Sequence, residues 1–217
     1  MCGRHVRKSP SASYADLFGV SGLPGTPSYN VAPTQAVAVV RPAGDQREAV
    51  LMRWGLIPFW AKDAKAAQIN ARSETVATKP TFRAAFKKRR CLVLADGYFE
   101  WKAEGKQKQP YYFHRPDDQP FAFAGLWECW KGPDGPVESC AIITTDANDV
   151  SRPIHDRMPV ILPMAACAPW LDHDIEDLEP LSELLTPYSA DEMECYPVNP
   201  IVGNVRNNSP VCIERIA

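Results

Sequence analysis

Short apolar runs rich in β-branched residues, separated by polar turns, dominate the hydrophobic pattern of this chain. Runs of this kind are typical of buried or half-buried strands rather than of long helices. A turn at residues 42–45 joins the first two expected strands. The strands that the pattern predicts are residues 35–41, 49–57, 91–95, 98–102, 111–114, 121–130, 139–145, 159–162 and 211–216.

Helical spacing of apolar residues is confined to a few segments. Residues 11–20 place Tyr14, Leu17 and Phe18 on one side of a short helix. The other expected helices are residues 73–77, 81–88 and the acidic stretch 174–185, which Pro180 can interrupt. Many strands with few helices between them predict an α+β fold, with a mainly antiparallel, curved or barrel-like β-sheet core and a few short helices.

The length of 217 residues, with 45% hydrophobic and 23% charged residues, fits one domain over residues 1–217. The 21 prolines are spread along the chain and favour short elements over long helices. No apolar run reaches the length of a membrane span, and the start of the chain lacks a signal-peptide pattern. We therefore expect a protein without a membrane partner in the cytoplasm, associated with the nucleoid if the source is bacterial.

Charge is distributed unevenly along the chain, although the net charge is only −2. Residues 1–157 hold 22 Lys and Arg against 16 Asp and Glu, whereas residues 158–217 hold 2 against 10. A basic face beside an acidic C-terminal part is compatible with nucleic-acid binding. Two solvated faces of opposite charge explain the pattern equally well.

The seven cysteines are odd in number and form no CxxC pair. This argues against a disulfide framework and against a zinc site, and we expect neither a metal nor a cofactor. Cys91 and Cys140 lie in apolar runs and are expected in the core.

Cys2 stands apart from the other cysteines because it follows the initiator methionine. Removal of Met1 would leave an α-amine and a thiol on one residue. The amine can condense with an aldehyde to an imine, and the thiol can close on the imine carbon to give a thiazolidine ring. An α-amine titrates near pH ~7.7–8.0 and a thiol near ~8.5, so both nucleophiles are partly available at neutral pH.

Four segments combine polar or aromatic residues with flanking apolar strands, and none is specific by itself. Glu100 could be an acid at a strand edge, and His155 a structural imidazole. Asn70 could cap a helix, and Arg157 could pair with Asp156 or another neighbour. The segments are residues 2–4, 69–75, 95–102 and 154–159.

Taken together and in this order, the motifs resemble the SRAP family, the SOS-response-associated peptidase-like proteins that shield abasic sites in single-stranded DNA. The resemblance runs through most of the chain. It rests on MCGR at the start, YNVAPT (29–34), WGLIPFWAKD (54–63), INARSET (69–75), ADGYFEWK (95–102), IHDRMP (154–159) and VGNVRN (202–207).

The resemblance implies roles for four residues. Cys2 would be the nucleophile that bonds to the opened sugar aldehyde. Asn70 would position the Cys2 amine or the new linkage, and Glu100 would be the acid/base group for ring opening. His155 would lie near the sugar oxygen and the flanking phosphate. A carboxylate beside aromatic groups and an imidazole can both move protons near neutral pH.

We expect a second set of residues, both basic and aromatic, to contact DNA. The basic members would contact phosphates, with Arg83 a weaker candidate, and the tryptophans would offer stacking surfaces. Core positions for Trp54 and Trp101 are equally compatible with the sequence, and Phe59-Trp60 stands where some relatives carry paired tryptophans. The set is Arg4, Asn30, Pro33, Trp54, Trp60, Arg72, Lys79 and Trp101.

Three functional readings follow. The first is a monomeric enzyme that binds abasic single-stranded DNA and forms a shielding thiazolidine crosslink through Cys2, with possible peptidase or lyase activity. The second is an N-terminal-cysteine peptidase, autoproteolytic or acting in trans, with His155 or the free amine as base. The third is a non-enzymatic reader of single-stranded or modified DNA, in which Cys2 is incidental.

Overall fold

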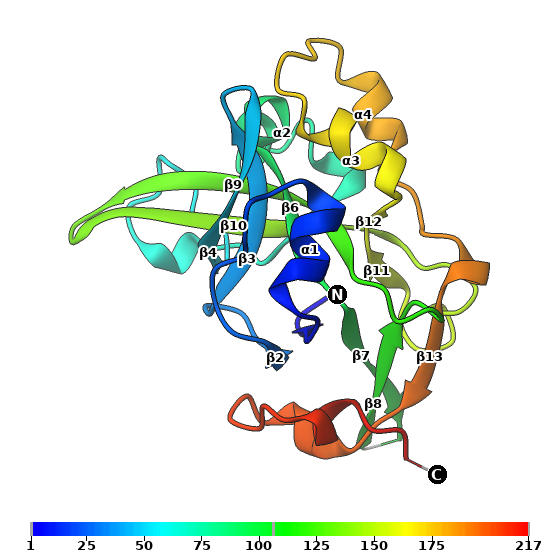
Figure 1. Ribbon diagram of the computed structural model, residues 1–217. Coiled ribbons are helices and arrows are strands. Elements are labelled where there is room, and N and C mark those ends of the chain that lie inside the picture. Colours follow the sequence, from blue (N-terminus) through cyan, green and yellow to red (C-terminus); the bar gives the residue numbers. More distant parts are fainter. Residues whose placement is uncertain (1, 106, 217) are drawn as a thin grey trace.

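The structure is a computed structural model that describes residues 2–105 and 107–216, and its centre is a closed ring of five strands (Figure 1). The ring runs β10–β4–β3–β6–β9 and returns to β10. Within this ring, only the β10–β4 pair is parallel. The strands are β3 (Ala36–Ala43), β4 (Gln46–Trp54), β6 (Arg90–Ala95), β9 (Phe121–Gly132) and β10 (Gly135–Asp146). This ring confirms the barrel-like core.

Both faces of β6 are covered, because all six of its residues are buried. Leu92 and Leu94 join one apolar cluster, and Cys91 and Val93 join another. Alternation between two buried faces explains why the sequence of this strand is continuously apolar. Three short strands extend the barrel sheet: β5 (Asn70–Arg72) and β11 (Arg157–Pro159) on β10, and β12 (Ile161–Leu162) on β9.

A second sheet, open and antiparallel, has the strand order β13-β8-β7-β1-β2. Its first strand is anchored by pairs His5–Tyr98 with β7 and His5–Val31 with β2. We call this the open sheet. Its strands are β1 (His5–Arg7), β2 (Ser28–Val31), β7 (Gly97–Glu104), β8 (Gln107–His114) and β13 (Glu194–Pro197).

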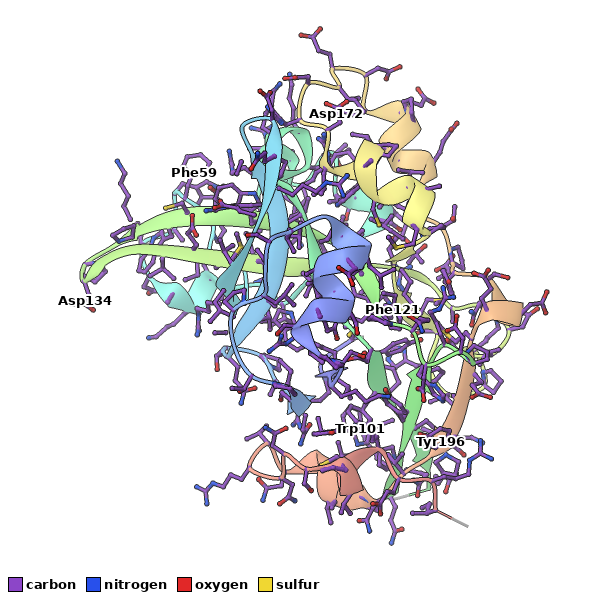
Figure 2. All side chains as sticks on the ribbon, in the orientation of Figure 1. Phe59, Trp101, Phe121, Asp134, Asp172 and Tyr196 are labelled. Carbon is purple, nitrogen blue, oxygen red and sulfur yellow. The ribbon has the colours of Figure 1, made fainter. Side chains whose placement is uncertain are left out.

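The helices are short, as expected. In Figure 1, α3 and α4 lie together at one end of the barrel, and α1 contributes Tyr14 and Phe18 to the cluster that contains Leu92. The tip of the β9–β10 hairpin, marked by Asp134 in Figure 2, projects away from the rest of the chain. The helices are α1 (Ser11–Phe18), α2 (Arg83–Lys88), α3 (Met164–Leu171) and α4 (Glu179–Glu183), with 3₁₀ turns η1 (Ala64–Ala66), η2 (Ser73–Thr75), η3 (Ala190–Glu192), η4 (Pro200–Gly203) and η5 (Pro210–Ile213).

The predicted α+β class with mainly antiparallel strands is confirmed. The strands β1, β2, β5 and β13 were not predicted, and the helix expected at residues 73–77 is the 3₁₀ turn η2. Three segments nearer the C-terminus also differ from prediction. The acidic helix expected at residues 174–185 is only the short α4, and Pro180 lies in its first turn, where proline is tolerated. The strand expected at residues 211–216 is mostly the 3₁₀ turn η5. Helix α3 was not predicted, because an apolar stretch containing Pro169 lacks helical periodicity.

None of the helices in residues 2–105 and 107–216 combines the length and the apolar character needed to cross a membrane.

Candidate functional site

The four residues expected to carry chemistry come from both sheets. Cys2 lies three residues before β1, and Glu100 lies in β7, so two of them are on the side of the open sheet. Asn70 begins β5, and His155 lies in the segment between β10 and β11, so the barrel sheet supplies the other two. The candidate site therefore lies where the two sheets meet.

Cys2 and Asn70 are joined directly. The Asn70 side-chain Nδ2 donates a hydrogen bond of 2.8 Å to the backbone carbonyl of Cys2. The other amide atom, Asn70 Oδ1, is buried and accepts no hydrogen bond from a described residue. A buried acceptor of this kind is costly unless a donor reaches it, so Asn70 Oδ1 is placed to accept an N–H from its surroundings.

The Cys2 side chain is fully buried, and so is most of Glu100, which is 4% exposed. Burial raises the pKa of the Cys2 thiol well above its ordinary value, and the nearby charge of Glu100 raises it further. The thiol is therefore protonated at neutral pH. Glu100 is close enough to the thiol to act on it electrostatically.

A cleft of about 440 Å³ opens beside Glu100. It also reaches His155, so an acid and an imidazole share one opening. Apart from Gly203, the other lining residues are basic or aromatic. We call this opening the sheet cleft. Its lining residues are Arg4, Glu100, Trp101, Lys108, His155 and Gly203.

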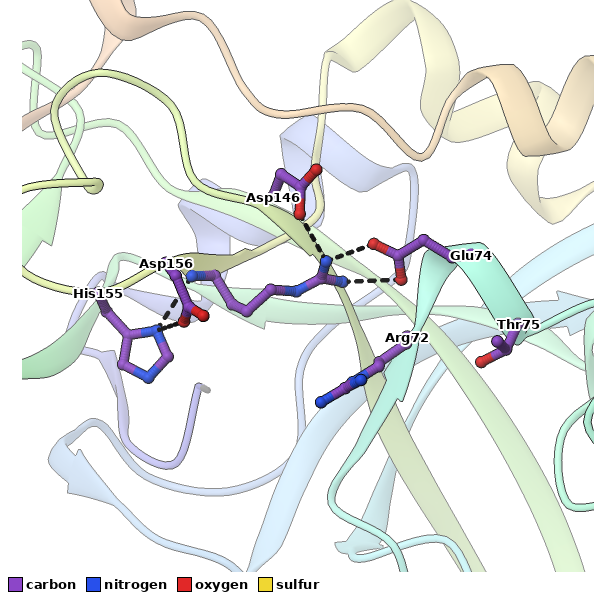
Figure 3. A pocket seen from close by; sticks show the side chains of 7 residues that line it. Arg72, Glu74, Thr75, Asp146, His155 and Asp156 are labelled. Carbon is purple, nitrogen blue, oxygen red and sulfur yellow. Dashed lines mark hydrogen bonds and ion pairs between the residues drawn. The ribbon is translucent and has the colours of Figure 1, made fainter.

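His155 also lines a second cleft of about 510 Å³, drawn in Figure 3, which we call the barrel cleft. His155 Nδ1 lies 3.0 Å from the backbone nitrogen of Arg157 and 2.9 Å from Asp156 Oδ1. A backbone N–H can only donate, so we assign Nδ1 as an acceptor and place the proton of the neutral ring on Nε2. The Asp156 carboxylate is 86% exposed and becomes a partner of Nδ1 only when the ring is protonated.

Arg157 connects the His155 segment to the segment that follows Asn70. Its two terminal nitrogens contact both carboxylate oxygens of Glu74, and they donate to Asp146 Oδ1 at 2.8 Å and to the Thr144 carbonyl at 2.7 Å. Burial alone lowers the pKa of Arg157, but these acidic partners raise it above its ordinary value. The sequence suggested Asp156 or another neighbour as its partner, and the structure selects Glu74 and Asp146.

On the open-sheet side, Arg4 and Asn30 organise the turn at residues 202–207. Arg4 donates to Asn30 Oδ1 at 2.8 Å and to the Val202 carbonyl at 2.9 Å. Asn30 Nδ2 lies 2.8–3.1 Å from the carbonyls of Val202, Asn204 and Asn207. Asn30 is only 1% exposed, which corrects the expectation of a direct DNA contact: its amide is used to hold the turn and Arg4.

The expectation that Trp54 contacts DNA also requires correction. The sequence left a stacking position and a core position equally open, and the structure shows the core position. Trp54 is fully buried, its indole nitrogen donates to the Ile69 carbonyl at 3.0 Å, and its ring lies 5.1 Å from that of His5. No face is left for a base. Trp101 remains half-buried at the rim of the sheet cleft, next to the C-terminal turn (Figure 2), with Arg4 6.0 Å from its ring centre.

The other expected DNA contacts are placed unequally. Arg72 is exposed and lines the barrel cleft, whereas Pro33 is half-buried outside both clefts. Trp60 is 53% exposed, and Lys79 and Arg83 are exposed, but none of them lines either cleft. Figure 2 labels Phe59, the equally exposed neighbour of Trp60, near the base of the β9–β10 hairpin.

No group of three or more His, Cys, Asp or Glu side chains in the described ranges is arranged to hold a metal ion. All seven cysteines are free.

The profile of the SOS response associated peptidase (SRAP) family matches residues 1–205. The chain belongs to the SRAP family. Relatives at full length include the abasic site processing protein YoqW of Bacillus subtilis (strain 168), 43% identical over 99% of each chain. The abasic site processing protein HMCES of Xenopus tropicalis is 34% identical over 100% of this chain and 78% of its own.

Solved structures are similar over the same span. A protein from Bacteroides thetaiotaomicron superposes with a TM-score of 0.88 at 29% identity, covering 100% of both chains. A protein from Bordetella bronchiseptica superposes with a TM-score of 0.81 at 29% identity, covering 91% of this chain and 100% of its own. This SRAP chain thus shares the fold of crystallised proteins from two bacteria.

Sequence reasoning missed several residues of the two clefts in this SRAP chain. Glu74 and Arg157 lie within the motifs INARSET and IHDRMP, so the sequence marked both segments. It did not indicate that these two residues form an ion pair. Gly203 lies within the motif VGNVRN but was not singled out, and Asp146 and Lys108 lie outside every motif.

Proposed function

We propose that this protein captures abasic sites in single-stranded DNA by forming a thiazolidine between Cys2 and the opened sugar. The observation that carries the proposal is the hydrogen bond from Asn70 to the Cys2 carbonyl, with Glu100 acting on the same buried thiol. The names of the relatives support the choice of lesion, because YoqW and HMCES are called abasic site processing proteins.

The chemistry begins after Met1 is removed. The Cys2 amine adds to the C1′ aldehyde of the ring-opened sugar, and the resulting carbinolamine loses water to give an imine. The thiol sulfur then bonds to the imine carbon, while the thiol proton moves to the imine nitrogen. One aldehyde and one aminothiol thus give one thiazolidine and one water, without an oxidant or a reductant.

Each neighbouring residue has a task in this sequence. Asn70 Oδ1, the buried acceptor, receives an N–H of the Cys2 amine and orients its lone pair toward the aldehyde. Because burial and Glu100 keep the thiol protonated, the amine attacks first and the thiol closes the ring second. Glu100 relays the proton in the closing step, and His155 assists opening of the sugar through Nε2.

The two clefts give the strand a path, since both reach His155. Arg4 and Lys108 in the sheet cleft and Arg72 in the barrel cleft supply phosphate contacts on the two sides of the lesion. Trp101 offers a face for an unpaired base, which contributes roughly 1–3 kcal/mol when a base stacks on it.

The test is a denaturing gel of purified protein with a single-stranded oligonucleotide that carries one abasic site, alongside the intact mass of the protein. We expect a band that survives denaturation and a mass that lacks Met1. Cys2→Ala should abolish the band and keep noncovalent binding, whereas Cys129→Ser, at a half-buried cysteine in β9, should leave it unchanged. An oligonucleotide whose abasic sugar is reduced to the alcohol should not react. Crosslinking by Cys2→Ala would contradict the mechanism.

Cys2→Ser separates the two steps. Serine retains the amine but not the thiol, so the imine should form without closing to a thiazolidine. Borohydride should then trap Cys2→Ser on the DNA, and without borohydride the band should be lost. A stable band from Cys2→Ser without reduction would show that the ring closure is not required.

A further inference from the structure

A third cleft, of about 310 Å³, lies between β1 and β2 of the open sheet and β3 and β4 of the barrel. His5 and Arg7 face it from β1, whereas Arg4 lines the sheet cleft. It shares no lining residue with either cleft of the candidate site. We call it the β1 cleft.

Arg7 is the feature of the β1 cleft that needs an explanation. It is 6% exposed, and among the described residues its guanidinium makes one hydrogen bond, from Nη2 to the Thr26 carbonyl. A guanidinium has five N–H donors, so most of this one is unused. A buried cation without an ion-pair partner is costly, because burial removes its hydration and nothing replaces it.

Arg90 shows what a buried arginine with a purely structural role looks like in the same chain. It is 2% exposed, and its guanidinium donates to four backbone carbonyls. The bond lengths to Trp170, Phe86 and Lys87 are 2.7–2.8 Å, and Asp172 supplies the fourth. Arg90 thus makes four hydrogen bonds to its own chain, whereas Arg7 makes one.

Asp96, the acidic residue of this region, has no hydrogen bond to Arg7 among the contacts of the described residues. Asp96 is buried, and its carboxylate accepts from the backbone of Lys8 and Ser9, the Ser9 hydroxyl and the Tyr14 hydroxyl. His5 adds no charge either, since burial and the nearby Arg7 lower its pKa to about 3. Among the described residues, no carboxylate forms an ion pair with the Arg7 guanidinium at the cleft.

The lining of the β1 cleft favours acceptors over donors in a ligand. None of the described residues that line it is Asp or Glu. Gln35 uses its oxygen on the Ala32 N–H, and Asn208 uses its oxygen on the Tyr29 N–H, so their amide NH₂ groups remain to donate. Val37 and the 44%-exposed Leu51 add apolar wall.

From this arrangement we propose that the β1 cleft binds the phosphate group of a nucleotide, with Arg7 as its principal ligand. Guanidinium groups pair with phosphate through two parallel hydrogen bonds, which would use the idle donors of Arg7. The volume equals that of about ten water molecules, so sugar or base atoms fit beside the phosphate. The amides of Gln35 and Asn208 suit such atoms. The phosphate comes from a free nucleotide or from a DNA strand, and the experiment distinguishes them.

The experiment is calorimetric titration of the full-length protein at low salt with inorganic phosphate and with thymidine 5′-monophosphate. Arg7→Met should weaken binding of the nucleotide at least tenfold. Arg47→Met, which removes a positive charge outside the β1 cleft, should bind like wild type. Nucleotide binding that is absent in wild type, or undiminished in Arg7→Met, would overturn the proposal.

Stability of the variant is checked together with binding. Replacing an uncompensated buried charge by an apolar side chain of similar length should leave the urea midpoint unchanged or raise it. Should Arg7→Met fail to fold, Ala36→Phe decides, because Ala36 is exposed at the cleft wall and a ring there fills the cleft without altering Arg7. Ala36→Phe should also lose at least tenfold in nucleotide affinity, and wild-type affinity would overturn the proposal.

A third titration, with an oligothymidylate that lacks abasic sites, identifies the source of the phosphate. If Arg7 holds a phosphate of the strand, Arg7→Met should lower the oligonucleotide affinity and reduce the salt slope by about 0.7. If the ligand is a free nucleotide, oligonucleotide binding should not change. None of these probes carries an aldehyde, so the result is independent of crosslinking by Cys2.

Discussion

On the barrel side of the seam, charged groups hold the candidate residues in place. Arg157 joins the His155 segment to Glu74, just beyond Asn70, and Asp146 completes the set. On the open-sheet side, Asn30 and the carbonyls of residues 202–207 do the same for Arg4. Partly exposed ion pairs weaken with salt and acid, whereas buried amide–carbonyl bonds do not. The two halves of one site should therefore respond differently to the solution.

The largest effect is expected from breaking the seam itself. Trp54 ends the barrel strand β4 and packs its ring against His5 of the open sheet. Trp54→Ala removes a fully buried side chain and should lower the free energy of unfolding by about 3–5 kcal/mol. Urea denaturation measures this. Trp101→Ala, at the rim, should cost far less stability and instead weaken binding of single-stranded DNA, and a reversal of this order would contradict the assignment of Trp54 to the core.

The open-sheet half is tested next by Asn30→Ala. The substitution leaves the carbonyls of Val202, Asn204 and Asn207 without their shared donor, and should cost about 2 kcal/mol of unfolding free energy. The loss should be the same at low and high salt. Asn30→Asp is the matched variant: it keeps an acceptor for Arg4 but cannot donate to the turn, so it should not restore stability. Full stability of Asn30→Asp would show that Arg4, not the turn, depends on Asn30.

His5 gives the seam a pH dependence of its own. Its pKa is lowered from 6.5 to about 3 by burial, so between these values the unfolded chain binds a proton that the folded chain does not. Stability should therefore fall as pH drops below 6.5, by up to about 1.4 kcal/mol per pH unit from this group. His5→Phe retains the aromatic contact with Trp54 and should flatten the dependence between pH 5 and 6.5, measured by urea midpoints. An unchanged slope would contradict a neutral, buried His5.

The smallest effect should come from the charged half. Hydrogen bonding to Arg157 lowers the pKa of Glu74, so the pair stabilises the fold above the ordinary carboxyl range and is lost as pH falls through the lowered pKa. Because the Glu74 side chain is 49% exposed, Glu74→Gln should cost only about 0.5–1 kcal/mol. The cost should disappear in high salt and in acid. Glu104→Gln, at an exposed position at the end of β7, serves as the control and should cost nothing.

Glu74→Gln should also change the rate of crosslinking, which a purely structural role of the ion pair would leave unchanged. Arg157 also fixes the His155 ring through its backbone N–H, so loosening the pair should slow crosslinking more than it weakens DNA binding. A misplacement of about 1 Å at a reacting centre can cost on the order of 100-fold in rate. Equal losses in binding and in rate would indicate that the pair acts only on DNA affinity.

The sequence by itself determined most of the barrel and suggested the candidate site residues. The short, continuous apolar run of β6 favours a strand with both faces buried, and the position of Cys2 after Met1 is what points to aminothiol chemistry. These features are local, because they depend on neighbouring residues alone. The predictions of a helix at residues 174–185 and a strand at residues 211–216 were wrong. The conformation of these segments depends on how the C-terminal part packs, and not on their own apolar spacing alone.

Only the tertiary structure decided which polar groups meet. The parallel pairing of β5 with β10 places Asn70 opposite Ile142 and brings Glu74, at the end of the same segment, to Arg157 and Asp146, which are far away in sequence. The same long-range packing buried Trp54 and Asn30, whose residue types suit either a core or a DNA surface. It also gave Arg90 four carbonyl acceptors and Arg7 one, a difference that the sequence does not show. Burial and pairing depend on contacts between distant strands, and local spacing does not encode them.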